Sequence, residues 1–283
     1  MRKDVEKNQY RISILGAGWL GLPLAIRLKE DGYNVKASTT SPDKLKVLSG
    51  HGIQPFLLKL EPDMRNISTL EDFLDTDLLL INIPPGTKKD PDNDAHVLQM
   101  KLLAQKLRQR PVSRIVYVSS TSVYADREGE AIREDEPVQV GNRVLFEAEE
   151  IVRSLSIDYC ILRMGGLTGY DRNLVRFFAG KKDLKGGESP VNLIHRDDCI
   201  GIIASLIGVD NPEVWNETYN CCSPVHPLKK DFYTGLARRF ELPLPEFVPG
   251  DRTGWKMISP DKLINRLGYQ YIYPDPLRYT YEK

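Results

Sequence analysis

The stretch YRISILGAGWLG, residues 10–21, decides how this sequence is expected to fold. Its first half is an apolar run typical of a buried strand, and its second half places three glycines across the start of a helix. Gly16 permits a tight turn, Gly18 leaves room for a pyrophosphate beside the backbone, and Gly21 lets helix and strand pack closely. The positive end of the helix attracts the negative charge. We therefore predict a dinucleotide site here, the alternative being a turn that is merely tight. The predicted contacts are Gly16, Gly18, Trp19, Leu20 and Gly21.

Apolar bursts of four to seven residues alternate with longer amphipathic segments through the first two thirds of the chain. This rhythm predicts a doubly wound α/β fold, in which helices cover both faces of a parallel sheet. The first helix is expected to end at Gly32, and the second to begin with Ser41 as its N-cap and Pro42 as its first residue. The predicted strands are residues 10–16, 34–39, 53–58, 77–83, 114–120 and 158–164.

The alternation of apolar and amphipathic segments ends after Gly166, where glycines and charged residues become frequent. Farther along, prolines interrupt the chain. We interpret residues 1–166 as a dinucleotide-binding Rossmann domain and residues 167–283 as a smaller substrate lobe. One apolar helix, residues 198–208, resumes the earlier pattern. Residues 199–211 are therefore expected to return to the first domain.

Cofactor choice is expected to depend on the end of the second strand. NAD-binding proteins usually carry a carboxylate there, which holds the ribose hydroxyls, but this chain has Thr39. The run that follows offers hydroxyls, a helix N-terminus and a lysine, which suit a 2′-phosphate better. We favour NADP, although Asp43 leaves NAD open. The predicted contacts are Thr39, Thr40, Ser41 and Lys44.

The segment NIPPG, residues 82–86, ends the fourth predicted strand on the cofactor side of the sheet. Its glycine and prolines are expected to shape the loop over the dinucleotide, with Pro84 limiting the freedom of the backbone. Ile83 and Pro84 are the predicted contacts.

Composition excludes several partners. The 39 basic and 39 acidic side chains cancel, so nothing favours nucleic acid. The apolar stretch 12–26 is too short to span a bilayer and contains glycines, so no membrane association is expected. Four cysteines without a CxxC pair argue against disulfides and a metal site, and favour a cytoplasmic protein.

Taken together, several motifs resemble the extended short-chain dehydrogenase/reductases, also called the NAD-dependent epimerase/dehydratase family. The resemblance covers nearly the whole chain, and details such as RVLFEAE are most similar to the atypical YeeZ-like bacterial subgroup. The matching segments are GAGWLGLPLA (16–25), VSSTSVYA (118–125), ILRMGGLTGY (161–170), NLIHRDDCI (192–200) and LINRLGYQYIYPDP (263–276).

The resemblance implies a Rossmann domain that binds NAD(P), a lobe that closes over a substrate, often a nucleotide sugar, and a possible homodimer. The implied chemistry is hydride transfer at a carbinol or carbonyl. Ser120, four residues before Tyr124, matches the serine that hydrogen-bonds the substrate oxygen in the family. Alternatively, Ser120 only ends a strand.

Family members also use a tyrosine and, four residues later, a lysine that lowers the tyrosine pKa. In the amphipathic helix expected from GNRVLFEAEE (141–150), Gly141 occupies the tyrosine position and Leu145 the lysine position. No tyrosine or lysine occurs from Ala125 to Arg153. Either another group replaces this relay, or the protein binds its cofactor without ordinary turnover.

Tyr124, Tyr170 and His195 are candidate replacements, because each belongs to a segment that borders the family's cleft. Each also has a structural interpretation: Tyr124 can pack against the following loop, and His195 can belong to its own turn. Asp197 or Asp198 is then expected to cap the next helix.

Three arginines are candidates for binding an anionic substrate, because a guanidinium fits phosphate or carboxylate. Charges on the solvated face of an amphipathic helix are the alternative. The candidates are Arg143, Arg172 and Arg176.

Three functional hypotheses remain. The first is an NAD(P)-dependent oxidoreductase or epimerase-like enzyme acting on a nucleotide sugar or another anionic carbonyl or carbinol compound. The second is a non-catalytic NADP-binding sensor or regulatory module. The third is an NADPH-dependent hydroxyacid-type dehydrogenase, because the N-terminal half also resembles the β-hydroxyacid dehydrogenases. That resemblance implies an all-helical C-terminal domain that carries the catalytic lysine.

Overall fold

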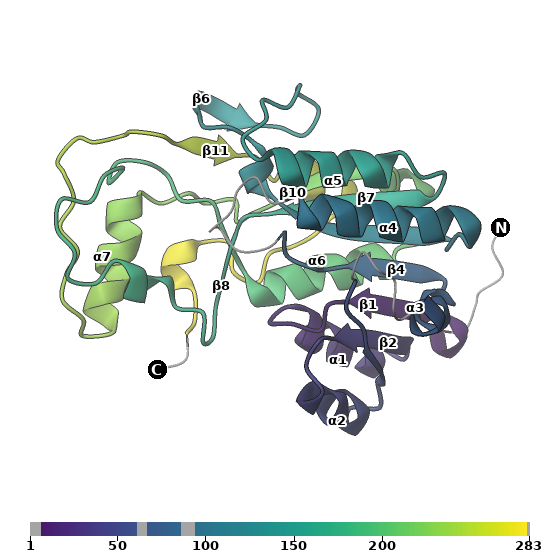
Figure 1. Ribbon diagram of the computed structural model, residues 1–283. Helices are drawn as coiled ribbons and strands as arrows, with labels where there is room; N and C mark the ends of the chain where they lie inside the picture. Colours follow the sequence, from purple (N-terminus) through teal and green to yellow (C-terminus); the bar gives the residue numbers. More distant parts are fainter. Residues whose placement is uncertain (1–6, 61–66, 86–93, 282–283) are drawn as a thin grey trace. The chain divides into compact units, whose positions relative to one another are not determined.

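The computed structural model describes residues 7–60, 67–85 and 94–281 of the 283-residue chain (Figure 1). Gly86, the last residue of the predicted cofactor loop, lies outside them. The chain divides into two compact units. Unit 1 comprises residues 1–119, 143–162 and 207–217, and unit 2 comprises residues 120–142, 163–206 and 218–283.

A seven-stranded sheet has the order β10-β7-β5-β4-β1-β2-β3. β1 pairs in parallel with both β2 and β4, and the outward pairs β2·β3 and β4·β5 are also parallel. The predicted doubly wound α/β class is confirmed, and each predicted strand is present within two residues of its expected ends. The strands are β1 (Arg11–Leu15), β2 (Asn34–Thr39), β3 (Gln54–Leu57), β4 (Leu78–Ile81), β5 (Arg114–Ser120), β7 (Asp158–Met164) and β10 (Glu217–Cys221).

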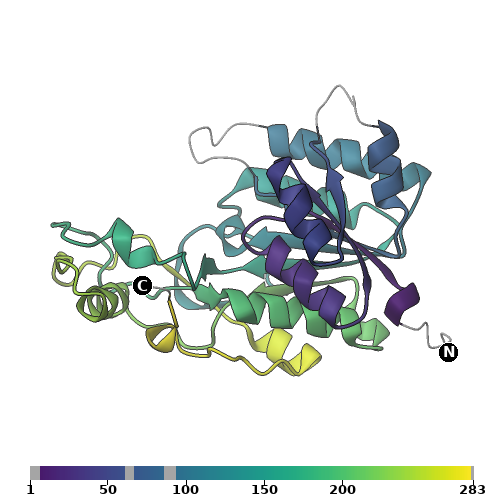
Figure 2. The ribbon, with the colours of Figure 1, turned by 90° about the horizontal axis from the view of Figure 1, so that it is seen from below.

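Helices alternate with the strands of unit 1, as Figure 2 shows from below. α1 packs against β1 and β2, and α2 against β2 and β3. The helices are α1 (Gly21–Glu30), α2 (Asp43–Gly50), α3 (Ile67–Leu74), α4 (Ala95–Gln109) and α5 (Arg143–Arg153).

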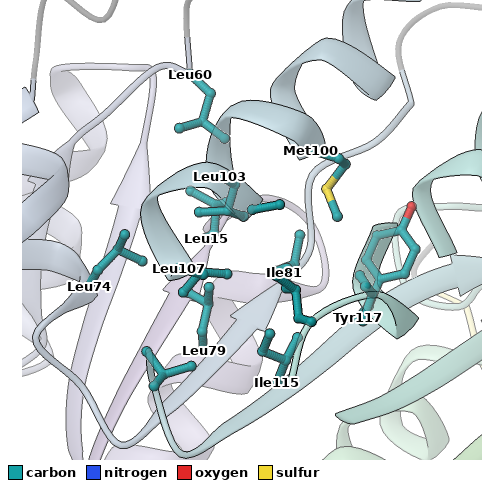
Figure 3. Packing of buried hydrophobic residues seen from close by; sticks show 14 of the residues in the cluster. Leu15, Leu60, Leu74, Leu79, Ile81, Met100, Leu103, Leu107, Ile115 and Tyr117 are labelled. Carbon is teal, nitrogen blue, oxygen red and sulfur yellow. The ribbon is translucent and has the colours of Figure 1, made fainter. Parts of the chain in front are cut away.

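One hydrophobic cluster of unit 1 lies between the sheet and the helices α3, α4 and α5 (Figure 3). Successive strand residues point to opposite faces, so Leu15, Leu79 and Ile81 face these helices. Met100, Leu103 and Leu107 come from α4 at helical spacing and are nearly fully buried. This packing fixes the carboxyl ends of β1 and β4 next to each other.

The end of α1 and the start of α2 were both predicted from the sequence. Gly32, with φ of +95°, directly follows the C-cap of α1, as predicted, because an L side chain rarely adopts that φ. The predicted N-cap of α2 is wrong by one residue. Pro42 is the N-cap and Asp43 the first helical residue, since Ser41 belongs to the preceding turn, where its N–H donates to Thr39 Oγ1 at 3.1 Å.

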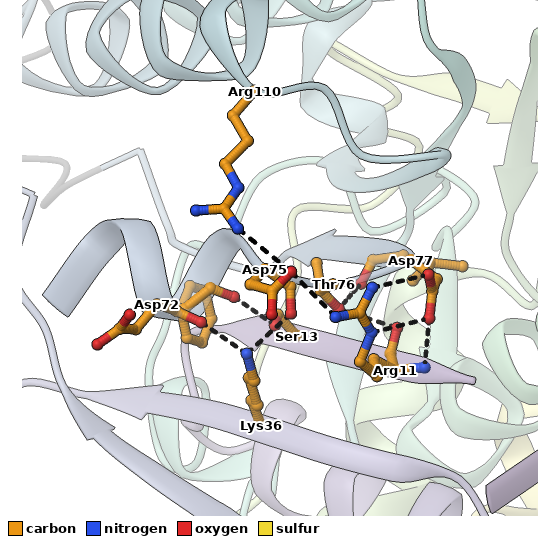
Figure 4. Close-up of polar contacts among 10 residues, drawn as sticks. Arg11, Ser13, Lys36, Asp72, Asp75, Thr76, Asp77 and Arg110 are labelled. Atoms are coloured by element: carbon orange, nitrogen blue, oxygen red, sulfur yellow. Dashed lines mark hydrogen bonds and ion pairs between the residues drawn. The ribbon is translucent and has the colours of Figure 1, made fainter. Parts of the chain in front are cut away.

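Charged groups connect the strands toward their amino ends, away from the glycine-rich loop (Figure 4). Arg11, which begins β1, donates to both carboxylate oxygens of Asp77, the residue before β4. Lys36 of β2 donates to the carbonyls of Asp72 and Asp75 at 2.6 and 2.8 Å, where α3 ends. Burial lowers the pKa of Lys36. These bonds tie β1, β2, β4 and α3 into one body.

A buried histidine on α4 makes stability depend on pH. His96 Nε2 lies 3.0 Å from Tyr117 Oη, and burial lowers the pKa of His96 to about 4. As the pH falls through about 6.5, the unfolded chain therefore binds a proton on this histidine, whereas the folded chain binds it only near pH 4. The stability that depends on neutral His96 is thus complete above about pH 6.5 and is lost as the pH falls. We expect this residue to remove about 2 kcal/mol from the free energy of unfolding between about pH 7 and about pH 5.

Urea unfolding at both pH values tests this expectation. His96→Phe is expected to reduce the pH dependence, whereas His51→Phe, at an exposed histidine of the same unit, is expected to leave it unchanged. An equal loss of stability in wild type and His96→Phe would contradict the assignment.

Unit 2 contains two small parallel sheets and a separate core. One core cluster joins α7 to residues near Val191 and Tyr279. The elements are β6 (Arg127–Ile132), β8 (Gly166–Thr168), β9 (Leu193–His195), β11 (Lys256–Ile258), α6 (Arg196–Gly208), α7 (Lys229–Arg239) and α8 (Asp261–Leu267). The short 3-10 helices of the chain are η1 (Lys7–Gln9), η2 (Thr121–Val123), η3 (Leu174–Phe177), η4 (Pro212–Val214) and η5 (Pro276–Arg278).

The division into units differs from the predicted domain boundaries. Residues 120–142 belong to unit 2, because β6 pairs with β11 and Ser259 donates to the Ile132 carbonyl. The segment that returns to unit 1 is 207–217, so only the end of the predicted 199–211 segment does so. Unit 2 also contains strands, which disagrees with the all-helical domain required by the hydroxyacid dehydrogenase hypothesis.

In the three described ranges, no helix is long and apolar enough to cross a membrane.

Candidate functional site

The glycine-rich loop between β1 and α1 has the geometry of an anion cradle. Gly16 has a φ of +108°, and a Cβ there would lie 2.6 Å from the Asn82 carbonyl oxygen. A Cβ on Gly21 would collide with the Gly16 carbonyl oxygen. Gly18, by contrast, is exposed, and a Cβ there would meet nothing within 4 Å. The loop is therefore closely packed on its protein side and open at Gly18, which fits a pyrophosphate approaching the backbone.

The other two residues of the loop differ in exposure. Leu20 is the N-cap of α1, is 3% exposed and makes no side-chain cap, so only its backbone is placed to contact a phosphate. Trp19 is half-buried. The first turn of α1 carries no acidic side chain, which leaves the positive end of the helix dipole unopposed within that turn.

Two residues that sequence analysis missed contact this loop. The Gly16 N–H donates to Ser38 Oγ at 3.0 Å, and Asn82 Nδ2 donates to the Gly16 carbonyl at 3.0 Å. Both lie at strand ends, in β2 and just after β4. Their contacts depend on strand order, which a local motif does not reveal.

The candidate ribose segment follows β2. Thr39 is buried, and its Oγ1 already accepts from the Ser41 N–H. Thr40 and Lys44 are exposed and Ser41 is half-buried. Three of the four predicted contacts are thus at least partly exposed.

The segment after β4 approaches the glycine loop from the other side. The Cγ2 of Ile83 would lie 3.4 Å from a Cβ on Gly16, so Ile83 flanks the turn. Pro84 is exposed. The predicted cofactor residues of β1, β2 and β4 all belong to unit 1.

Ser120 ends β5 and caps the 3-10 helix η2. Its Oγ accepts from the Ser122 N–H at 3.2 Å and from Ser122 Oγ at 3.1 Å, and the residue is half-buried. Since both bonds are accepted by the oxygen, the Ser120 hydroxyl proton can be donated to another group. It is the first residue of unit 2.

Tyr124 lies in the same turn as Ser120 but is enclosed. The residue is 2% exposed, its hydroxyl donates to Asn220 Oδ1 at 2.9 Å, and Arg163 Nη1 donates to it at 2.6 Å. Burial raises the pKa of Tyr124. The phenol therefore already has a donor and an acceptor inside unit 2, which favours its structural interpretation.

His195 is likewise buried. Its Nδ1 accepts from the Asp197 N–H at 3.3 Å, its Nε2 lies 3.4 Å from the Thr280 carbonyl, and its ring packs 4.0 Å from that of Tyr273. Burial lowers the pKa of His195, so the neutral ring is favoured. These contacts hold the C-terminal segment rather than present a base to solvent.

The expected capping role of the two aspartates is wrong, because α6 begins at Arg196 and places both in its first turn. Asp197 accepts from the Tyr170 hydroxyl at 2.8 Å, and Asp198 accepts from the Ile272 N–H at 2.7 Å. Tyr170 has a φ of +54°. Because the Tyr170 hydroxyl donates to Asp197, it is already bonded to a carboxylate within unit 2.

Gly141 and Leu145 lie in tight surroundings. The Gly141 N–H donates to the Val123 carbonyl at 2.8 Å, and a Cβ on Gly141 would collide with the Tyr124 carbonyl. Leu145 is 3% exposed, on the buried face of α5. Neither position has space for a larger polar side chain without rearrangement.

The three predicted substrate arginines are divided between the two units. Arg143 belongs to unit 1 and donates to Asp94 and Glu147, each at 2.7 Å. Arg172 and Arg176 are exposed in unit 2, in the turn before η3 and in η3 itself.

Comparisons with known proteins agree with this geometry. The NAD(P)H-binding family model matches residues 16–206. Protein YeeZ of Escherichia coli (strain K12) is 36% identical over 275 residues, 94% of this chain and 97% of YeeZ.

Solved structures share the fold. A Methylobacillus flagellatus protein whose name places it among the NAD-dependent epimerase/dehydratases superposes with a TM-score of 0.75 at 25% identity, covering 94% of each chain. The UDP-glucose 4-epimerase of Thermus thermophilus, in complex with NAD, gives a TM-score of 0.74 at 16% identity, covering 95% of this chain and 97% of that one. The chain therefore belongs to the NAD(P)H-binding family, as a relative of YeeZ with the fold of the NAD-dependent epimerase/dehydratases.

Proposed function

We propose that the protein binds NADP at the loop after β1 and transfers hydride to or from a carbonyl or carbinol group of an anionic small molecule, such as a nucleotide sugar. The observation that carries the proposal is the open backbone at Gly18 beside the start of α1, where a Cβ would meet nothing within 4 Å. NADP would supply or accept the hydride, and residues of this chain would bind and orient it.

NADP is favoured over NAD by the segment after β2. Thr40 and Lys44 are exposed there, and the residue that ends β2 is Thr39, whose hydroxyl is held by the turn. A lysine beside the start of α2 complements a 2′-phosphate, whereas ribose hydroxyls would gain less from it.

Lys44→Ala is therefore expected to weaken NADPH binding about fivefold to tenfold and NADH binding by less than about twofold, since one charge-assisted bond is lost. Fluorescence titration with both nucleotides measures the effect. Lys46→Ala, at an exposed lysine on the same helix, is the control and should change neither Kd. Equal losses for the two nucleotides would remove the preference for NADP.

Ser120 is the proposed contact to the substrate oxygen. Its Oγ accepts two bonds from Ser122, so its proton can be donated to a carbonyl. The resemblance aligns Gly141 and Leu145 with the missing tyrosine and lysine, so the proposed reduction takes its proton from solvent. A positioned acid or base typically raises the reaction rate about 10²- to 10⁴-fold, so we expect slow turnover without this pair.

A single-turnover experiment tests this activity. Excess protein is mixed with NADPH and a panel of nucleotide 4-keto sugars and other anionic ketones, and absorbance at the reduced nicotinamide band is followed. We expect at least one compound to oxidise NADPH, with a rate at least about 100-fold lower in Ser120→Ala, because the oxygen loses its hydrogen-bond donor. Ser113→Ala, at an exposed serine just before β5, should react as the wild type does.

A second function, dinucleotide binding without turnover, is favoured by the packing at Gly141. Backbone atoms of Tyr124 and Ala125 occupy the space that a side chain there would need. Tight NADPH binding without oxidation across the panel, together with a protein partner whose affinity depends on the redox state of the cofactor, would support this sensor.

A further inference from the structure

The side chain of Asn82 lies against the glycine-rich loop. Asn82 follows β4, and its backbone N–H donates to the Leu15 carbonyl at 2.9 Å, extending the pairing of β4 with β1. Its side-chain Nδ2 donates to the Gly16 carbonyl at 3.0 Å. The same Nδ2 would lie 2.9 Å from a Cβ on Gly21. One amide thus bonds to the first glycine of the loop and occupies space that a side chain at the last glycine would need.

Ser38 holds the other side of Gly16. Ser38 Oγ accepts from the Gly16 N–H at 3.0 Å, and the Ser38 carbonyl accepts from the Ala17 N–H at 2.7 Å. Ser38 is 2% exposed and fixed in β2. The two peptide groups that flank the Gly16 Cα are therefore held from two neighbouring strands, at a φ of +108° that only glycine adopts readily.

We propose that Asn82 is a positioning residue for the dinucleotide, with Ser38 as its partner. Acting through the Gly16 carbonyl, Asn82 keeps the loop in the conformation that exposes the backbone at Gly18. Without the amide, the loop can adopt other conformations, and binding must then select the competent one at a cost in affinity. The inference rests on the proposed binding of NADP at this loop.

The experiment is a calorimetric titration of the full-length protein and its variants with NADPH, with melting temperatures measured without nucleotide. Asn82→Ala is expected to raise the NADPH Kd about tenfold, as for one lost hydrogen bond. Asn82→Asp should raise it about 50-fold or more, because a carboxylate would face the Gly16 carbonyl and repel the phosphates. Ser38→Ala is expected to act in the same direction as Asn82→Ala.

Asn211→Ala is the matched control. Asn211 Oδ1 accepts from the Glu213 N–H at 2.9 Å in an exposed turn of unit 1, so the substitution also removes one bond from an asparagine side chain to the backbone. It should leave the Kd unchanged. If Asn82→Ala does not fold, Ser38→Ala decides the question.

The outcomes separate the two claims. Wild-type protein that binds no NADPH would overturn the proposed function and this inference together. Wild type that binds NADPH while Asn82→Ala and Ser38→Ala bind within about twofold of it would overturn the inference alone. A loss of affinity that Asn211→Ala reproduces would assign the effect to general destabilisation and also overturn it.

Discussion

Gly18→Val is expected to abolish dinucleotide binding while leaving the fold intact. A Cβ at Gly18 would meet no protein atom within 4 Å, so the isopropyl group projects into the space proposed for the pyrophosphate. Displacing the phosphates from the backbone amides removes several charge-assisted hydrogen bonds, which we expect to raise the Kd for NADPH by at least about 100-fold. Calorimetry gives the Kd, and circular dichroism on heating gives the melting temperature, expected within about 3 °C of wild type.

Gly16→Ala provides the contrast. Its Cβ would lie 2.6 Å from the Asn82 carbonyl oxygen at a φ of +108°, so this substitution strains the folded chain itself. Its melting temperature should fall, whereas that of Gly18→Val should not. Wild-type affinity in Gly18→Val would show that the dinucleotide does not approach the backbone at this loop.

Gly141→Ala is expected to destabilise the protein strongly, although the change adds only one methyl group. The methyl carbon would collide with the Tyr124 carbonyl oxygen, and the neighbouring Ala125 nitrogen would lie 2.7 Å away. Both are backbone atoms, so relief requires the turn after Ser120 to move away from Gly141. We expect a loss of about 3 kcal/mol or more in the free energy of unfolding.

Gly235→Ala is the matched control for urea unfolding of this variant. Gly235 lies inside α7, and a Cβ there would meet nothing within 4 Å. It should stabilise the protein by about 0.5–1 kcal/mol, because alanine favours a helix over glycine. If Gly141→Ala were as stable as wild type, the packing that we describe around Gly141 would be wrong, and a tyrosine could be introduced there.

The packing at Gly141 also affects whether the family's tyrosine and lysine pair could be introduced into this chain. A tyrosine at this position needs the same Cβ, so restoring the family pair requires a different path of the backbone between Tyr124 and Gly141. If Gly141 and Leu145 occupy the family's tyrosine and lysine positions, as we propose, two substitutions alone would not restore the pair in this chain.

The sequence predicted the strands because their apolar runs are buried in a parallel sheet, and such runs are visible without long-range information. Gly16, Gly21 and Gly32 were predictable for a similar reason, since each requires a local conformation or a close approach. The N-cap of α2 was misplaced by one residue, because Ser41 donates its N–H to Thr39 rather than capping the helix.

Other features of the candidate site depend on contacts between distant segments. Tyr124 meets Asn220 and Arg163, and no local pattern reveals that its hydroxyl is already satisfied. Ser38 and Asn82 reach Gly16 only because β2 and β4 both neighbour β1 in the sheet. A search for such partners would first need the strand order, and would then ask which polar residues end the strands beside a glycine loop.

The most direct test of the whole account is a calorimetric titration of folded wild-type protein with NADPH, NADP⁺, NADH and NAD⁺. We expect saturable heat at one nucleotide per chain, tighter binding of the phosphorylated forms, and loss of the signal in Gly18→Val. Folded protein that gives no heat with any of the four nucleotides would contradict the account at its base.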